Sequence, residues 1–200
     1  SSYSGSGTSW RDLSPSVNNY SLYASTTYDS ADKNSLVFNG TSAYAAPSQI
    51  YPIGPQVGNC KVTIEAVFKN TNTSGYTILG HNRSANPHGF IQLVGGTQFT
   101  LAVVSTLSSP FAYFFSHSQS LSTNTWYHGI ISISIPYQAS GTAICSGNVG
   151  INGVIHSTSQ SILCEATAQN YALDIGRQIN YIWGQNYFTG KIGLVRIYNR

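Results

Sequence analysis

The chain has 200 residues, enough for one sizeable domain, and only 8% of them are charged, against roughly 25% in an ordinary soluble domain. The formal net charge of +3 comes from nine scattered Lys and Arg residues without a basic run, so the charge footprint of a nucleic-acid-binding protein is missing. No apolar stretch reaches the roughly 18 residues of a membrane-spanning helix, so we expect neither a nucleic-acid partner nor membrane insertion.

Gly, Asn and Ser are abundant and the chain contains 14 Tyr, a mixture that favours strands and turns over helices. The stretch SLVFNG (35–40) predicts a short strand that ends in a turn. In CKVTIEAVFKN (60–70), Val62, Ile64, Ala66 and Phe68 alternate with polar residues. This alternation predicts a strand with one buried and one wet face.

The segment TNTWYHGIISISI (123–135) is the strongest predicted strand, with Tyr127, Gly129, Ile131, Ile133 and Ile135 on one face. Asn152-Gly153 lies between apolar flanks and predicts a two-residue hairpin turn. In the closing stretch FTGKIGLVRIYNR (188–200), the apolar residues change face around Gly193. This change predicts either a strand covered on both faces or a β-bulge near Gly193.

Roughly ten to twelve short strands, with turn signals every ~8–12 residues, predict an all-β antiparallel two-sheet jelly-roll sandwich. No linker, repeat or low-complexity tract divides the chain, so we expect residues 1–200 to form a single domain. The chain starts at Ser1 without Met. We interpret that end as a cut or processed edge and expect the domain to be part of a longer protein.

The three cysteines are Cys60, Cys145 and Cys164, an odd count without zinc-site spacing. They are interpreted as buried small residues, with a Cys145–Cys164 bridge as the alternative. If Asn152-Gly153 is the turn, residue 145 faces about residue 160. The hairpin therefore favours reduced thiols.

Six acids occur in the chain: Asp12, Asp29, Asp32, Glu65, Glu165 and Asp174. A retaining glycoside hydrolase needs two carboxylates about 5–5.5 Å apart, and no two of these acids are spaced for one strand face. Glu65 is interpreted as a solvated face residue and His128 as a hydrogen-bonded structural histidine. We therefore expect no enzyme activity and no catalytic residue.

The ordered set GSGTSWRDLS (5–14), SLVFNG, VTIEAVFK (62–69), LSTNTWYHGIISI (121–133), GINGV (150–154) and FTGKIGLVRIYNR resembles the laminin-G-like, concanavalin A-like lectin/glucanase domains over nearly the whole chain. The opening stretch is similar to the modules of tailed-phage virion proteins. It departs from them after Ser14, where Pro15-Ser16-Val17 replaces the usual Gly-Asn-Gly. The resemblance implies a jelly roll whose last strand returns beside the N-terminal strand.

The resemblance also implies a non-catalytic, lectin-like virion module with a decoration, tail-fibre or host-adhesion role. Its implied partners are other virion subunits, a host-surface glycan or further copies of the same chain in a homo-oligomer. The alternatives are a secreted, extracellular carbohydrate-binding or adhesion domain and a glycan-active enzyme. Some relatives hold calcium, for which Asp12, Asp29, Asp32 and Asp174 are the loop candidates here; otherwise we expect no cofactor and no metal.

Sugar rings stack on aromatic side chains, while amides and guanidinium groups bond their hydroxyls. Two loops, 176–188 and 80–89, concentrate these residue types, and the predicted ligand-binding residues are Arg177, Asn180, Tyr181, Trp183, Gln185, Tyr187, Asn82 and Arg83. Trp183 packing over the end of the sandwich is the alternative. Residues 110–118 are interpreted as a core strand or as an exposed subunit contact.

Overall fold

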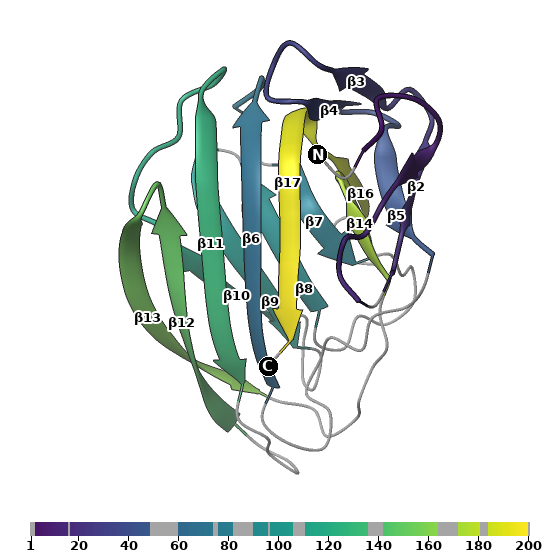
Figure 1. Ribbon diagram of the computed structural model, residues 1–200. Helices are drawn as coiled ribbons and strands as arrows, with labels where there is room; N and C mark the ends of the chain where they lie inside the picture. Colours follow the sequence, from purple (N-terminus) through teal and green to yellow (C-terminus); the bar gives the residue numbers. More distant parts are fainter. Residues whose placement is uncertain are drawn as a thin grey trace.

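The computed structural model describes residues 3–15, 17–48, 60–73, 76–81, 90–95, 97–105, 111–135, 142–163, 172–180 and 184–199. No helix occurs among these residues, and so none there is long and apolar enough to cross a membrane. Two antiparallel sheets pack face to face, with the seven-stranded sheet in front and the eight-stranded sheet behind it in Figure 1. The predicted all-β jelly-roll sandwich is confirmed.

The seven-stranded sheet has the order β13-β12-β11-β6-β17-β4-β3. Its strands are β3 (Thr27–Asp29), β4 (Ser35–Asn39), β6 (Cys60–Asn70), β11 (Trp126–Ile135), β12 (Thr142–Ile151), β13 (Val154–Leu163) and β17 (Thr189–Asn199).

The eight-stranded sheet has the order β1-β2-β5-β14-β7-β8-β9-β10. Its strands are β1 (Ser9–Trp10), β2 (Tyr20–Tyr23), β5 (Tyr44–Pro47), β14 (Leu173–Ile175), β7 (Tyr76–His81), β8 (Phe90–Gly95), β9 (Phe99–Ser105) and β10 (Phe111–Ser116). A separate two-stranded sheet consists of β15 (Arg177–Asn180) and β16 (Gly184–Tyr187). The described strands outnumber the predicted ones because seven of them, β1, β2, β3, β5, β14, β15 and β16, have only two to four residues, too few to show a clear period.

The predicted alternation in β6 is confirmed. Val62, Ile64, Ala66 and Phe68 are each at most 1% exposed and face the eight-stranded sheet. The next layer of the core is aromatic, because the ring of Phe68 stacks on that of Phe99 with centroids 5.4 Å apart. Alternation along β6 therefore fixes which face of the sheet is core and which is the outer face.

The Asn152-Gly153 turn is confirmed as the β12–β13 hairpin, with φ of 49° at Asn152 and 87° at Gly153. Both values are positive, as a type I′ turn requires. All ten residue pairs of β12 and β13 follow in unbroken register. This register places Cys145 opposite Gln160, as predicted; Cys164 lies outside the described residues.

The predicted bulge near Gly193 is also confirmed. Along β17 the partner of Ile192 is Phe68 and that of Leu194 is Val67, so Gly193 is the extra residue. Beyond the bulge, Val195 and Ile197 return to the core face. The implied position of the last strand is wrong, because β17 lies between β4 and β6 while β1 belongs to the other sheet (Figure 1).

Candidate functional site

The predicted loop 176–188 forms the β15–β16 hairpin, in which Arg177 is paired with Tyr187 and Asn180 with Gly184. The Tyr187 hydroxyl donates a hydrogen bond to Oε1 of exposed Gln185 at 3.0 Å. At Asn180 the structure describes the backbone and not the side chain. Tyr181, Trp183, Asn82 and Arg83 lie outside the described residues, and the ligand-binding role of this set stays a prediction.

Arg177 is 8% exposed, and its described contacts are internal to the protein. Its Nε and Nη2 donate to Oδ2 of buried Asp174 at 2.8 and 2.5 Å, and its guanidinium lies 3.3 Å from the ring centroid of Tyr44. Burial opposes the charge, but attraction to Asp174 raises the pKa of Arg177. Arg177 therefore ties the hairpin to the sandwich, a contact that depends on the neighbouring strands β5 and β14.

A ladder of planar groups continues from Arg177 towards the surface. The Tyr44 ring stacks on that of Tyr23 with centroids 4.7 Å apart and planes 3° from parallel. Tyr23 is 44% exposed. The structure thus presents an aromatic ring that sequence reasoning missed, because the pairing of β2 with β5 is not local in the chain.

Asp29, the last residue of β3, and Asp32, in the turn that follows, are hydrogen-bonded to side chains on the outer face of the seven-stranded sheet. Lys191 donates to Asp29 at 2.6 Å and to Asp32 at 2.8 Å. Lys69 also donates to Asp32, and the Trp126 indole donates to Asp32 at 2.7 Å. Hydrogen bonds from Lys191, then Lys69 and Trp126, lower the pKa of Asp32, and Lys191 lowers that of Asp29.

The carboxylates of Asp29 and Asp32, two of the calcium candidates, are thus already paired with the ammonium groups of Lys191 and Lys69. The carboxylate of Asp12 instead accepts hydrogen bonds from the backbone N–H groups of Ser14 and Asn18, both at 2.8 Å. Asp174 is bonded to Arg177. Across the described ranges, no three His, Cys, Asp or Glu residues form a group that could hold a metal ion.

Glu65 lies at the centre of a second polar cluster on the same outer face. Its Oε1 is 2.9 Å from His128 Nε2, and its Oε2 accepts from Arg196 at 3.2 Å and from Tyr198 at 3.4 Å. Burial favours the neutral acid, but the bonds from His128 and Arg196 lower the pKa of Glu65. The hydrogen-bonded His128 is confirmed. The interpretation of Glu65 as a solvated residue is wrong, because its partners from β11 and β17 leave its side chain only 16% exposed.

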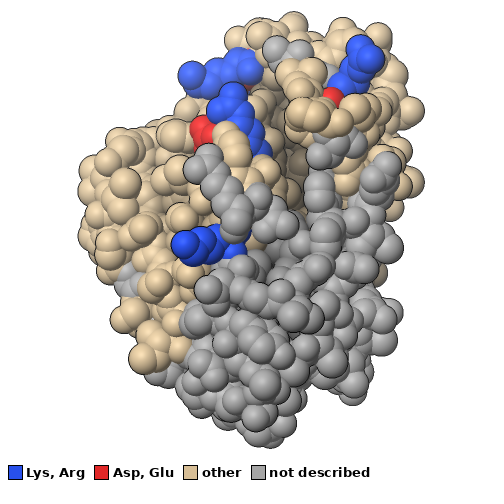
Figure 2. Space-filling view, turned by 60° about the horizontal axis from the view of Figure 1, so that its bottom comes forward, with Lys and Arg blue, Asp and Glu red and all other residues tan. Residues whose placement is uncertain are grey.

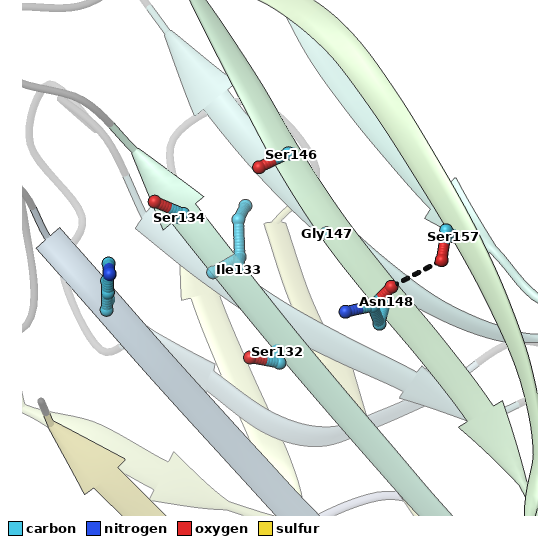
Figure 3. Close-up of a pocket in the computed structure, with 8 residues that line it drawn as sticks. Ser132, Ile133, Ser134, Ser146, Gly147, Asn148 and Ser157 are labelled. Atoms are coloured by element: carbon cyan, nitrogen blue, oxygen red, sulfur yellow. Dashed lines mark hydrogen bonds between the residues drawn. The ribbon is translucent and has the colours of Figure 1, made fainter.

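A hydroxyl-lined hollow of about 190 Å³ lies on this outer face, where β11, β12 and β13 run side by side (Figure 3). Its lining consists of Lys61, Ser132, Ile133, Ser134, Ser146, Gly147, Asn148 and Ser157. The Ser157 hydroxyl donates to Asn148 Oδ1 at 2.7 Å. The lining thus offers donors, acceptors and one cation, and it includes no carboxylate.

Register explains the hollow, since small side chains meet on three successive strands. Ser134 is paired with Ser146 and Asn148 with Ser157. Ser132 also accepts a hydrogen bond from Thr63 of β6 at 3.1 Å. Each serine alone looks like an ordinary solvated residue, so sequence reasoning missed the site. The signal that could have found it is the Asn152-Gly153 turn, which sets the β12–β13 register.

The basic side chains do not gather into one patch on the face drawn in Figure 2. They lie in separate places among tan residues, and acidic side chains accompany those at the upper left and the upper right. This distribution agrees with the absence of a basic run in the sequence.

The segment 110–118 contains β10, at the edge of the eight-stranded sheet. Phe115 and His117 are each 1% exposed, which supports the core-strand interpretation at those positions. The side chains of residues 110–114 lie outside the described part, so the alternative of a subunit contact stays a prediction for them.

Comparison with known proteins gives a family match, whereas no curated protein sequence matches the chain. Similar solved structures include botulinum neurotoxin type C, in a study of its dependence on two ganglioside molecules for cell entry (14% identity, TM-score 0.56, covering 97% of this chain and 46% of that one). Another is the botulinum neurotoxin DC binding domain in complex with rat synaptotagmin II (12%, TM-score 0.53, 98% and 45%). A third is tailspike protein 2 of the Escherichia coli O157:H7 bacteriophage CAB120 (15%, TM-score 0.52, 89% and 25%).

These likenesses show the shared fold, and this chain spans less than half the length of each of the three proteins. The family model for the concanavalin A-like lectin/glucanases superfamily matches residues 39–200, which include every strand from β5 to β17 and the hollow. The chain belongs to the concanavalin A-like lectin/glucanase superfamily, in its laminin G group.

Proposed function

We propose that this domain is a non-catalytic module that binds a host-surface glycan as part of a tailed-phage virion. The observation that carries the proposal is the hydroxyl-lined hollow, whose serines, Asn148 and Lys61 match the donors and acceptors of a sugar. Lys61 gives a preference for a glycan that bears a carboxylate, sulfate or phosphate group.

The carboxylates support a role without catalysis. A glycosidase keeps one carboxylic acid protonated by raising its pKa. Among the described residues, the pKa values of Asp12, Asp29, Asp32 and Glu65 are all lowered, and each carboxylate accepts hydrogen bonds from the protein itself. Asp174 is held by Arg177. None of these groups is arranged as a general acid.

Placement on a virion rests on the opening stretch GSGTSWRDLS, which resembles phage virion modules, and agrees with the fold shared with the phage tailspike. Adhesion is a use to which such a fold is suited, because the sheets hold a polar surface still while it meets a ligand. The low content of charged residues is compatible with contact through hydrogen bonds.

The test is binding of the chain to an array of neutral and anionic oligosaccharides, including host-envelope polysaccharide. We expect anionic glycans to be retained, and Lys61→Ala and Asn148→Ala each to weaken binding about tenfold, which is the loss of one charge-assisted or well-formed hydrogen bond. Lys33→Ala is the matched control, since Lys33 is an exposed lysine beside Trp126, outside the hollow.

No retention of any glycan, or equal binding by all three variants, would overturn the hollow as the site. A selective loss in Trp183→Ala, with an unchanged melting temperature, would place binding at the predicted loop 176–188 instead. Release of reducing ends from a β-glucan by the wild type, lost in Glu65→Gln, would contradict the absence of catalysis.

A further inference from the structure

An exposed tyrosine ring on the outer face of the eight-stranded sheet is held in place by the groups stacked behind it. Tyr23 of β2 is paired with Tyr44 of β5, and their rings are 3° from parallel with centroids 4.7 Å apart. The guanidinium of Arg177 lies 3.3 Å from the ring centroid of Tyr44, and buried Asp174 accepts two hydrogen bonds from that guanidinium. Tyr23 is therefore the outermost member of a series of contacts that begins at a buried ion pair.

The side of Tyr23 that faces away from Tyr44 is open. Ser9 of β1 pairs with Ser21, and a backbone hydrogen bond continues this pairing by one residue. The next position of the same register, opposite the tyrosine, is Gly7, at which an added Cβ atom would meet nothing within 4 Å. Tyr23 is accordingly 44% exposed, and β2 lies at the margin of the sandwich in Figure 1. A ligand can therefore reach the ring from solvent.

Hydroxyl groups accompany this ring. Alternate positions of a strand share a face, so Ser21 lies on the same face as Tyr23, and its partner Ser9 lies beside it. Both serines are exposed. Each carboxylate of the described residues is already bonded within the protein, so a cationic ligand would find no free counter-charge among them. An aromatic face with hydroxyls beside it suits an uncharged, polar ligand.

We propose that Tyr23 is the stacking platform of a second carbohydrate site, which takes one pyranose ring of a neutral oligosaccharide. The weakly positive C–H groups of the sugar lie on the negative face of the aromatic ring, and the hydroxyls of Ser9 and Ser21 exchange hydrogen bonds with those of the sugar. Because Tyr44 and Arg177 already hold the ring, binding costs little side-chain freedom at Tyr23.

The platform is separate from the hydroxyl-lined hollow. The hollow lies on β11, β12 and β13 of the seven-stranded sheet, whereas Tyr23 and Tyr44 belong to the other main sheet. The proposal therefore does not depend on the function proposed for the hollow. A proline-rich peptide is the competing ligand, but such peptides dock in grooves lined by several aromatic residues. Tyr23 instead presents one ring face, with Tyr44 stacked behind it.

The test is an NMR titration of the 200-residue chain with neutral hexasaccharides of glucose, mannose and N-acetylglucosamine, and with decaproline as the peptide probe. We expect a hexasaccharide to bind and decaproline not to bind. Tyr23→Ala removes the platform and is expected to weaken sugar binding about tenfold or more. Tyr23→Phe keeps the ring and loses one hydroxyl, so its binding is expected to stay within about threefold of the wild type.

Tyr198→Ala is the matched control, since Tyr198 is 36% exposed on β17, on the outer face of the other main sheet. It is expected to bind these neutral sugars as the wild type does. Lys61→Ala is also expected to bind them unchanged, which separates this site from the hollow. Thermal unfolding verifies the fold of each variant.

Four results overturn the proposal. The first is that no hexasaccharide binds, and the second is that decaproline binds in place of the sugars. The third is sugar binding that survives Tyr23→Ala or that Tyr198→Ala abolishes. The fourth is a loss in Tyr23→Phe as large as that in Tyr23→Ala, because stacking on the ring would then not carry the binding.

Discussion

Gly129 tests the packing between the two sheets, because at this residue β11 lies close against Phe99 of β9. A Cβ atom added at Gly129 would lie 2.4 Å from Phe99 Cζ and 2.7 Å from its two Cε atoms. Phe99 is fully buried and stacked on Phe68, so the ring has no room to retreat. Gly129→Ala is therefore expected to force the sheets apart locally.

The magnitude follows from two opposing terms. Overpacking a buried site costs about 1–3 kcal/mol. Replacing Gly by Ala inside a strand returns roughly 0.5–1 kcal/mol. Midway values of the two terms leave a net fall of about 1 kcal/mol in the free energy of unfolding, which for a chain of this size lowers the melting temperature by about 2–4 °C.

The assay is urea unfolding with thermal melts, and Gly193→Ala is the control. A Cβ atom at Gly193 would have its nearest contacts at 3.8 Å, an ordinary distance, so that variant should be neutral or slightly more stable. Adding Phe99→Leu to Gly129→Ala should cost less than Phe99→Leu alone, because the smaller side chain relieves the clash. A Gly129→Ala protein as stable as the wild type would refute the reasoning.

Two more predictions concern polar groups. Asp32 accepts hydrogen bonds from three side chains, and these bonds lower its pKa in the folded protein. Its contribution to the free energy of unfolding is therefore complete above the pKa of the unfolded chain, about 4, and is lost as the pH falls through the lower pKa of the folded protein. When the free energy of unfolding is measured from pH 7 to pH 2, it should fall less steeply with pH in Asp32→Asn than in the wild type. The same dependence on pH in both proteins would contradict the prediction. His117 is buried, with Nδ1 accepting from Gln119 N–H at 3.0 Å and Nε2 lying 3.1 Å from Val154 O. His117→Phe leaves both backbone groups without this partner and should cost about 1–3 kcal/mol in urea unfolding, whereas no loss would show that water replaces the ring.

Elements with a local signature could be predicted from the sequence. The burial of alternate residues in β6 follows from its period of two, and the β12–β13 turn from Asn152-Gly153. The change of apolar face at Gly193 marked the bulge. Each of these features depends on residues a few positions apart, which a pattern can reveal.

The candidate site could not be predicted in the same way. Glu65 looked isolated because its partners His128 and Arg196 come from strands 63 and 131 residues away. Arg177 was predicted as a ligand-binding residue from its loop, and sequence alone does not place Tyr44 beneath its guanidinium. The hollow needed the β11–β12 register, which no turn signal specified. The missing information was in every case the pairing of distant strands.

The position of β17 between β4 and β6 also has a consequence for the order of synthesis. Ile197 pairs with Ile64, 133 residues earlier, and Ile192 pairs with Leu36, 156 residues earlier. At about 5–20 residues per second, a ribosome needs roughly 7–30 s to make the intervening chain. During that interval β4 and β6 each have an interior edge whose native partner has not yet been made, and such edges invite pairing with other chains. The seven-stranded sheet is therefore completed last, when β17 inserts between β4 and β6 through contacts that are distant in the sequence. Such contacts favour slow folding, and the exposed edges favour a need for chaperones while the chain is incomplete.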